Sequence, residues 1–263
     1  MSKTFLPLLL ILFVMTGCGC NSDDGKKCND TIIIGLDDAY APFGFKDEHG
    51  RLVGFDIDLA KEVAERMGVK VEFKGIDWSK KYDELESGNI DIIWSGFNVM
   101  PERKEHVMFS KPYMENRQVI LVAKGKGAGI ISVADLAGKI VGTQLASPAY
   151  NFINQDEELK NSFGKYITYD NYEHAFEALM NGKLDAVICD ELVVHYEMIR
   201  HHDKFDVIET TVGSATDIAV GFRKSDTELL ERFQNAFDEM VEDKTAREIS
   251  LKWFQADLIK MHH

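Results

Sequence analysis

The sequence is poor in cysteine and in basic residues for its length. Only four of its 263 residues are cysteine, and three of them, Cys18, Cys20 and Cys28, fall before residue 30. A disulfide framework is therefore excluded, so a hydrophobic core has to hold the fold together. Lys and Arg number 30 against 44 Asp and Glu, which gives a formal net charge of -14. We expect no nucleic-acid partner, because phosphate binding needs a basic face.

The sequence also lacks a hydrophobic run of the roughly 20 residues that a membrane-spanning helix needs. Its N-terminus has Lys3, an apolar stretch over residues 5–15 and two small residues before Cys18. This layout is typical of a secretory signal, so we expect residues 1–17 to be removed. The small residues before Cys18 resemble the bacterial lipoprotein box and predict lipidation there; ordinary secretion is the alternative. Residues 18–30 would then form a polar, lipidated tether.

Histidines are few and lack the spacing of a metal site. The pairs His201-His202 and His262-His263 are adjacent in sequence, whereas a helical site places its ligands four residues apart. We expect no metal and no cofactor. With 45% hydrophobic and 28% charged residues, the composition is that of an ordinary globular protein.

Strand and helix patterns alternate from residue 31 onward. Residues 31–36 are rich in β-branched side chains, and residues 69–73 begin another strand. Between them, Phe55–Met67 has an apolar side chain at every third or fourth position and ends at Gly68, which predicts an amphipathic helix with a glycine cap. The alternation indicates an α/β fold with parallel strands.

A weak internal repeat indicates two similar α/β lobes. Residues 82–96 (YDELESGNIDIIWSG) and 176–190 (FEALMNGKLDAVICD) align without a gap. Each reads as the end of a helix, a glycine stop and a buried strand. Residues 33–35 and 140–142 give each half an opening strand that ends in glycine. The residues shared by the repeat are Leu85 with Leu179, Gly88 with Gly182, and Asp91 with Asp185.

The two lobes are expected to share a hinge of two strands. Residues 118–123 read as a strand that leaves the first lobe, and residues 217–222 as one that returns. We therefore assign residues 31–121 plus 218–258 to lobe one and residues 122–217 to lobe two. Two crossings allow hinge closure, and ligands of open α/β sheets bind beyond the carboxyl ends of the strands.

Five motifs follow one another along the chain. They are AYAPFGF (39–45), GFDIDLAKEVA (54–64), DIIWSGFNVMPERKE (91–105), FSKPY (109–113) and GKLDAVICDE (182–191). In this order and spacing, from Ile32 to about Asp257, the chain resembles the family 3 solute-binding proteins of bacterial ABC transporters. That group includes lysine/arginine/ornithine, histidine and glutamine receptors.

The resemblance implies a fold, partners and a location. The fold would be periplasmic-binding-protein-like, of type II, with two lobes that close on a free amino acid. The partner would be the membrane permease of an ABC transporter, and the protein would be a monomer. It would act outside the cytoplasm, either lipid-anchored at the outer face of the bacterial cell membrane or in the periplasm. We expect a binding protein, not an enzyme.

The resemblance also implies roles for single residues. Arg103 stands where the family grips the ligand α-carboxylate, and Asp190 where it grips the α-ammonium. A zwitterion taken from water needs opposite charges at a fixed separation, and a guanidinium matches a carboxylate as a two-pronged fork. Tyr40 and Trp78 correspond to the aromatic walls of the cleft. Asp37 lies at its distal end.

The other candidates surround the backbone of the ligand. Ser147 and Pro148 read as the cap and first residue of a helix whose free N–H groups would face the carboxylate. Ser95 and Asn98 are placed to hydrogen-bond the ligand backbone. The full set of expected ligand-binding residues is Asp37, Tyr40, Trp78, Ser95, Gly96, Asn98, Arg103, Gln144, Ser147, Pro148 and Asp190.

Each assignment competes with a purely structural role. Arg103 lies in the charged PERKE run, which is typical of a solvated helix start, and Asp190 could cap the following helix. The two aromatic residues could belong to the lobe cores, and Asp37 could shape a turn. Cys189 reads as a small buried hydrophobic residue.

Departures from the family pattern leave the ligand side chain open. Asn98 stands where Ser or Thr is usual, Gly96 where Ser is frequent, and Pro148 where many members have Thr. The alternatives are lysine or arginine, glutamine, cystine or another polar ligand. Two other functions stay open: a cyclohexadienyl or arogenate dehydratase on the same fold, which needs a general acid with a raised pKa, and a sensor domain with a separate membrane partner.

Overall fold

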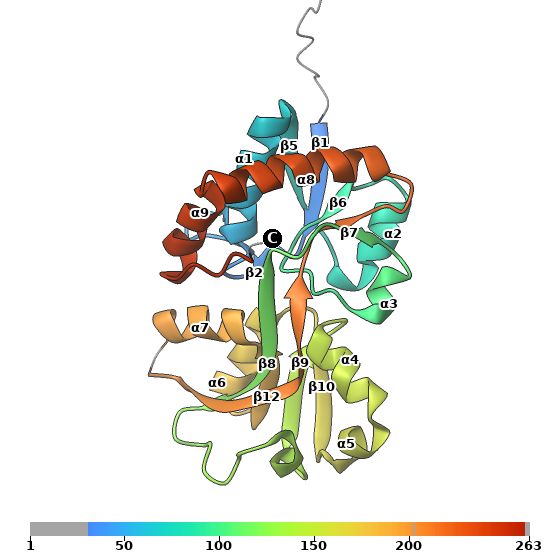
Figure 1. Cartoon of the computed structure of the whole chain (residues 1–263). Helices are drawn as coiled ribbons and strands as arrows, with labels where there is room; N and C mark the ends of the chain where they lie inside the picture. Colours follow the sequence, from blue (N-terminus) through green and yellow to red (C-terminus); the bar gives the residue numbers. More distant parts are fainter. Residues whose placement is uncertain (1–30, 202, 261–263) are drawn as a thin grey trace, which may run out of the picture.

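The computed structural model describes residues 31–201 and 203–260. The predicted signal, the lipidation site Cys18 and the tether lie outside the described residues. The rest folds into two α/β lobes, each built on a five-stranded sheet (Figure 1). The strand order is β5-β1-β6-β13-β7 in lobe one and β10-β9-β11-β8-β12 in lobe two. The predicted fold class is confirmed.

Lobe one contains both ends of the described chain. Its strands are β1 (Thr31–Leu36), β2 (Ala39–Tyr40), β3 (Gly44–Lys46), β4 (Leu52–Val53), β5 (Lys70–Gly75), β6 (Ile92–Ile93), β7 (Met108–Phe109) and β13 (Gly221–Phe222). Its helices are α1 (Phe55–Met67), the 3₁₀ helix η1 (Trp78–Lys80), α2 (Lys81–Glu86), α3 (Pro101–Lys104), α8 (Thr227–Glu242) and α9 (Thr245–Phe254). Strands β2, β3 and β4 form a separate small sheet.

Lobe two is formed by the middle of the chain. Its strands are β8 (Met114–Ala123), β9 (Ile140–Gln144), β10 (Lys165–Tyr169), β11 (Ala186–Asp190) and β12 (Phe205–Ile218). Its helices are the 3₁₀ helix η2 (Val133–Leu136), α4 (Pro148–Gln155), α5 (Glu157–Ser162), α6 (Tyr172–Met180) and α7 (Glu191–Arg200). None of the helices in the described ranges is long and apolar enough to cross a membrane.

Helix α1 follows the predicted bounds. Phe55, Leu59 and Val63 are buried on one face, which packs against α8 and α9. Gly68 ends the helix in the left-handed conformation, with φ 68°, and its N–H donates to the carbonyl of Glu65. The apolar periodicity thus predicts both the helix and the face that it buries.

The internal repeat has a structural counterpart in each lobe. Asp91 accepts a hydrogen bond from the backbone N–H of Ile33 at 2.9 Å, and Asp185 accepts one from Ile140 at 2.7 Å. In return, each aspartate donates its own N–H to the carbonyl of the same partner, at 2.7 Å and 2.8 Å. The shared aspartates therefore fasten the start of β6 to β1 and of β11 to β9.

The glycines that end the two opening strands are also equivalent. A Cβ on Gly35 would lie 2.4 Å from the side chain of Ile90, and one on Gly142 would lie 2.5 Å from Leu184. Ile90 and Leu184 occupy the same position of the repeat. Close packing against this neighbour therefore favours glycine in both lobes.

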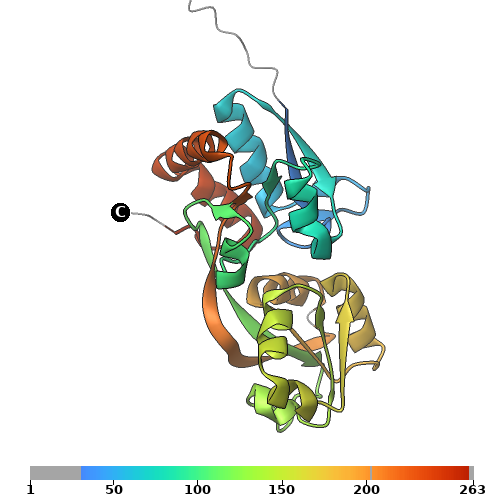
Figure 2. The same cartoon turned by 90° about the vertical axis from the view of Figure 1, so that its right-hand side faces the viewer.

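The strands β8 and β12 run between the lobes side by side and antiparallel (Figures 1 and 2). The second crossing was expected over residues 217–222, but β12 already begins at Phe205, and the short β13 follows it. Its register against β8 shifts twice, and these irregularities hide the strand from a simple alternation pattern. The proposed division of the chain at residues 121 and 218 stays a prediction.

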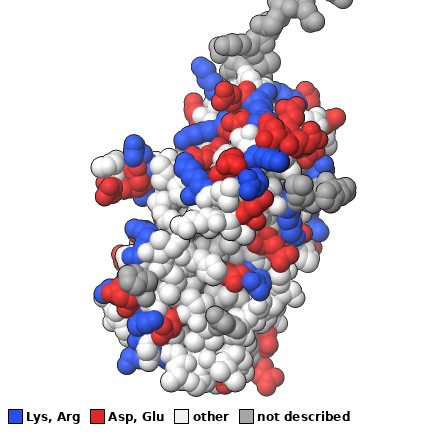
Figure 3. Space-filling view, turned by 60° about the vertical axis from the view of Figure 1, so that its left-hand side comes forward, with Lys and Arg blue, Asp and Glu red and all other residues white. Residues whose placement is uncertain are grey.

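Charges of both signs are interspersed on the face drawn in Figure 3. Lys and Arg side chains lie among Asp and Glu over lobe one, and lobe two carries fewer charges on this face. This face therefore offers no continuous basic surface of the kind that binds phosphate backbones.

Candidate functional site

The structure places all of the predicted ligand-binding residues around one small cavity between the lobes. Seven come from lobe one: Asp37, Tyr40, Trp78, Ser95, Gly96, Asn98 and Arg103. Four come from lobe two: Gln144, Ser147, Pro148 and Asp190. The cavity lies beyond the carboxyl ends of β1, β6, β9 and β11, where the fold places ligands.

Arg103 is a buried cation at this cavity. It lies in α3 with 1% of its surface exposed, so its charged PERKE neighbourhood does not make it a solvated residue. The guanidinium donates to the carbonyls of Asn98 and Ala146, both at 3.1 Å, and lies 4.6 Å from the ring centre of Phe97. No carboxylate within the described residues is close enough to form an ion pair with it. Burial lowers the pKa of Arg103, yet a guanidinium stays charged at any pH that proteins experience.

Asp190 is the buried anion on the opposite wall. It ends β11 in lobe two and has 1% of its surface exposed. One oxygen, Oδ2, accepts a hydrogen bond from the Tyr40 hydroxyl at 2.8 Å. The other, Oδ1, accepts bonds from the amides of Asn116 and Gln118, the latter at 2.7 Å. Burial raises the pKa of Asp190, while these donors and the charge of Arg103 oppose the rise.

Sequence reasoning missed Asn116 and Gln118. Both are buried residues of β8, and neither amide oxygen has a hydrogen-bond partner in the described part of the chain. A buried amide oxygen without a donor costs free energy. Both residues bear this cost while their amide nitrogens donate to Asp190. Nothing in the local pattern of β8 distinguishes them from strand residues that face solvent.

Asp37 joins the lobes at another point of the cavity. Its Oδ2 accepts a hydrogen bond from Gln144 of lobe two at 2.6 Å, and its Oδ1 accepts one from the N–H of Ala39 at 3.0 Å. The residue therefore both shapes the turn before β2 and faces the cavity. Burial raises the pKa of Asp37 to about 6.

The loop after β6 supplies Ser95, Gly96 and Asn98. Ser95 accepts a hydrogen bond from the N–H of Asp37 at 3.2 Å, and Asn98 donates to the Thr216 hydroxyl at 2.8 Å. Gly96 has φ 53°, and a Cβ there would lie 2.7 Å from the ring of Tyr40. Glycine in place of the family's frequent serine is thus explained by this close approach.

Gly96 is held from behind by a residue that the sequence did not single out. Its N–H donates to Asp56 at 2.6 Å, and the Tyr113 hydroxyl donates to the other oxygen of the same carboxyl at 2.8 Å. Burial raises the pKa of Asp56 to about 7. Helix α1 therefore fixes the cavity loop through its first turn.

Ser147 and Pro148 begin α4 as predicted. The Ser147 hydroxyl accepts a hydrogen bond from the N–H of Tyr150 at 3.0 Å, and Pro148 is the first helical residue. Both line the cavity, so the amino end of α4 is directed toward it. A helix start carries partial positive charge, which adds to that of Arg103.

Trp78 lies against a second buried cation. The Lys81 ammonium is 4.9 Å from the ring centre of Trp78, 4.8 Å from that of Tyr82, and 3.0 Å from the Trp78 carbonyl oxygen, to which it donates. Burial lowers the pKa of Lys81 to about 7, and the charge of Arg103 acts in the same direction. The sequence did not indicate this residue, because a Lys-Lys pair is typical of a solvated helix start.

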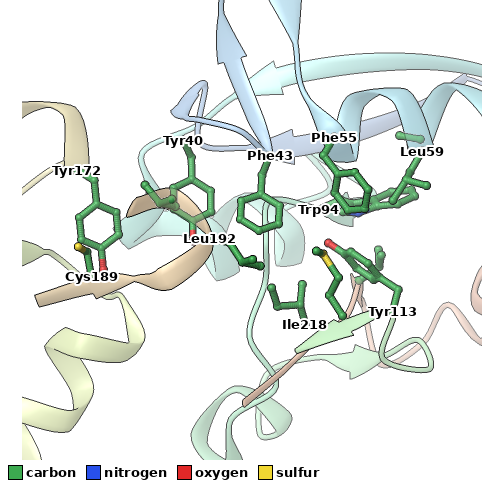
Figure 4. Packing of buried hydrophobic residues seen from close by; sticks show 14 of the residues in the cluster. Tyr40, Phe43, Phe55, Leu59, Trp94, Tyr113, Tyr172, Cys189, Leu192 and Ile218 are labelled. Carbon is green, nitrogen blue, oxygen red and sulfur yellow. The ribbon is translucent and has the colours of Figure 1, made fainter. Parts of the chain in front are cut away.

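Aromatic rings continue from lobe one into lobe two through Tyr40. Its ring stacks on Phe43 at 5.2 Å on one side and on Tyr172 of α6 at 6.2 Å on the other. Figure 4 shows Tyr172, Tyr40, Phe43 and Phe55 in succession. The sequence left open whether Tyr40 is a cavity residue or a core residue. The structure shows that it is both.

The lobes are closed on each other in this structure. In addition to the contacts of Tyr40 and Asp37, the Arg103 guanidinium of lobe one reaches Ala146 of lobe two, and the Asn151 amide donates to Glu102 at 2.6 Å. Groups from both lobes line the cavity, so a molecule held there would contact both lobes.

Cys189 is a buried thiol, and the described residues hold no metal-ligating cluster. The Cys189 thiol is free and fully buried among hydrophobic residues, and burial raises its pKa far above the usual value. No cluster of three metal-ligating side chains occurs in residues 31–201 and 203–260. His202, His262 and His263 lie outside those ranges.

Comparison with known proteins agrees with this geometry. The family model described as bacterial extracellular solute-binding proteins, family 3, matches residues 32–256. The arginine-binding extracellular protein ArtP of Bacillus subtilis (strain 168) is 31% identical over 260 residues, 97% of this chain and 99% of the relative.

Two solved structures are similar along most of the chain. A substrate-binding protein of an ABC uptake transporter from Streptococcus pneumoniae with bound histidine has a TM-score of 0.84 and 36% identity, covering 89% of this chain and 96% of that one. The ancestral amino acid-binding protein AncCDT-1, described as a precursor of cyclohexadienyl dehydratase, has a TM-score of 0.75 and 35% identity, covering 85% and 95%. The chain belongs to the family 3 bacterial extracellular solute-binding proteins.

Proposed function

We propose that the protein is the extracytoplasmic substrate-binding component of an amino-acid ABC transporter. The observation that carries the proposal is the pair of buried opposite charges, Arg103 of lobe one and Asp190 of lobe two, on one enclosed cavity. A free amino acid presents a carboxylate and an ammonium, and the guanidinium of Arg103 and the carboxylate of Asp190 are complementary to them in charge. Each charge-assisted hydrogen bond of this kind contributes roughly 1.5–3 kcal/mol.

Closure follows from the division of the site between the lobes. A ligand that touches only Arg103 in an open protein gains the contact with Asp190 when the lobes meet. The ligand therefore has a higher affinity for the closed state and shifts the population toward it. The closed form would present a surface to the membrane permease that the open form lacks.

The ligand side chain is proposed to be polar or basic. Trp78 lines the cavity with an aromatic ring, and Asp37 with Gln144 offers hydrogen-bonding groups that come from both lobes. Relatives described as binding arginine and histidine support this class. An aromatic face attracts a cation, and a carboxylate can pair with it.

We also propose the route and place of action. Cleavage before Cys18 and lipidation of its sulfur would anchor a monomeric receptor at the outer face of the membrane, on a tether that ends near residue 30. Several acyl chains make such anchoring stable. The proposal is supported by the order of charge, apolar stretch and small residues in the sequence.

A dehydratase is the second candidate, and Asp37 is the observation that favours it. A dehydratase of the cyclohexadienyl class needs a general acid that carries a proton near neutral pH, and burial raises the pKa of Asp37 to about 6. The similarity to a precursor of such an enzyme points the same way. The donors already bound to both oxygens of Asp37 favour the binding protein.

A thermal-shift screen separates the two functions. The protein is heated with each of the twenty amino acids, with prephenate and with arogenate, and a ligand at 100 times its dissociation constant should add about 2.7 kcal/mol of stability. We expect one or a few polar or basic amino acids to raise the melting temperature. Steady formation of an aromatic product from prephenate or arogenate, with no shift by any amino acid, would overturn the proposal.

A further inference from the structure

The two strands that join the lobes change register beside the cavity. Gln118 and Asn116 are two residues apart on β8. Their partners on β12, Val212 and Thr216, are four residues apart. Extra residues on one strand interrupt the ladder and let the strand bend. Gly213, at φ 72°, lies in this stretch. The connection between the lobes is therefore irregular here, as it also is between Ile208 and Val212, and can bend at this stretch.

The two ends of the irregular stretch are tied to different lobes. On one side, the Thr216 hydroxyl accepts a hydrogen bond from Asn98, a cavity residue of lobe one, at 2.8 Å. On the other side, Gln118 is paired in the sheet with Asp190, the cavity acid of lobe two. Bending at this stretch would thus move Asn98 relative to Asp190.

Asn116 makes the bond that spans the irregular stretch. It is the ladder partner of Thr216, on the lobe-one side, yet its side-chain amide donates to Oδ1 of Asp190. Gln118 donates to the same oxygen at 2.7 Å, but from within lobe two. Of the two amides that hold Asp190, the one on Asn116 is therefore the one whose position depends on the hinge.

The space behind Asn116 permits this movement. Asn116 lines an open groove whose walls are Leu192 and Ile199 of α7 in lobe two and Trp253 and Leu258 of lobe one. The groove leaves open space between these walls. A change in the angle between the lobes would therefore separate Asn116 from Asp190.

We propose that Asn116 is a closure-dependent positioning residue of the ammonium-binding site. Its amide reaches Asp190 when the lobes close, and this last donor favours the charged, correctly oriented carboxylate at the moment the ligand is enclosed. Through Thr216 the same ladder pair also contacts Asn98, so one point of the hinge touches binding residues of both lobes. The inference rests on the proposed function, amino-acid binding at Asp190.

The test compares Asn116→Leu with the wild-type protein, using the amino acid that stabilises the wild type most and the α-hydroxy acid of the same side chain. Calorimetry gives both affinities, and stopped-flow tryptophan fluorescence gives the association and dissociation rates. Arg117→Gln is the matched control, because Arg117 is the adjacent residue of β8 and its side chain pairs with Glu191 at the surface. Asn116→Ala replaces Asn116→Leu where the larger side chain impairs folding.

The expected result is specific to the ammonium. Asn116→Leu should weaken the amino acid roughly 10- to 100-fold, through faster dissociation with unchanged association, and should weaken the hydroxy acid less than about threefold. Equal losses of affinity for both ligands would mean that Asn116 has only a structural role. A lower association rate would mean that Asn116 acts in the open form. Either result overturns the inference. If the wild type binds no amino acid, the proposed function fails instead.

Discussion

The Tyr40 hydroxyl of lobe one donates a 2.8 Å hydrogen bond to the carboxylate of Asp190 in lobe two. This bond joins the lobes at the group proposed to bind the ligand ammonium. It also lowers the pKa of Asp190 against the rise caused by burial. Closure and the charge of the site are therefore linked through one hydroxyl group.

Tyr40→Phe should weaken amino-acid binding by roughly tenfold, the loss expected for one hydrogen bond to a charged group. The variant loses a donor that favours the charged carboxylate, so the pKa of Asp190 should rise further. Because a protonated Asp190 does not pair with an ammonium, the deficit should widen as pH falls. Calorimetry at pH 5 and pH 8 measures this trend, with Tyr166→Phe as a control away from the cavity. A deficit that is the same at both pH values would contradict the link.

Arg103→Lys should weaken binding by roughly 10- to 100-fold although it keeps the positive charge. An ammonium cannot present two parallel donors to a carboxylate, and it would also lose the contacts to the carbonyls of Asn98 and Ala146. Lys104→Gln, an exposed change on the same helix, is the control. Equal affinities of Arg103→Lys and the wild type would remove Arg103 from the carboxylate site.

Lys81→Met should stabilise the protein most at pH 6 and hardly at all near pH 10. The pKa of Lys81 is about 7 in the folded protein against an ordinary value of 10.5. Between these values the unfolded chain binds a proton that the folded protein does not, so stability rises with pH in the wild type. The gain at pH 6 should be on the order of a few kcal/mol.

Urea denaturation of the wild type and Lys81→Met at several pH values measures this difference. All other titrating groups are shared, so their effects cancel when the two proteins are compared. A difference in unfolding free energy that does not depend on pH would mean that Lys81 is not a buried, proton-releasing lysine.

Gly96→Ala should lower the free energy of unfolding by about 1–3 kcal/mol and weaken ligand binding as well. The backbone at φ 53° disfavours a side chain, and the new Cβ would push the ring of Tyr40. Gly88→Ala is the matched control, because Gly88 has φ 77° and open space around it. Gly88→Ala places a side chain at a positive φ, as Gly96→Ala does, but its new Cβ contacts no neighbouring side chain. If both variants lose the same stability and keep full affinity, Gly96 has no role in the cavity.

The sequence predicted the features that recur or that stand at strand ends. The repeat singled out Asp91 and Asp185, because the same pair of backbone hydrogen bonds in each lobe requires the same residue at equivalent positions. Within a lobe, cavity residues at strand ends could be found because neighbouring parallel strands end at one edge, so loops such as those of Asp37 and Ser95 must meet.

The remaining features depend on contacts that no local pattern records. Asn116 acts through a ladder pair with Thr216, 100 positions later in the chain, and through an acid on a third strand. Lys81 is buried only because Trp78 and Tyr82 cover it. The length of β12 was missed because its register shifts interrupt the alternation of buried and exposed positions.

Calorimetry with three ligands tests the central claim most directly. The wild-type protein is titrated with the amino acid found by the screen, with the amine that lacks its carboxylate, and with the hydroxy acid that lacks its ammonium. If Arg103 and Asp190 bind the two ends of a zwitterion, each analogue should bind at least about 100-fold more weakly than the amino acid. Binding of either analogue within about threefold of the amino acid would contradict recognition of a zwitterion at this cavity.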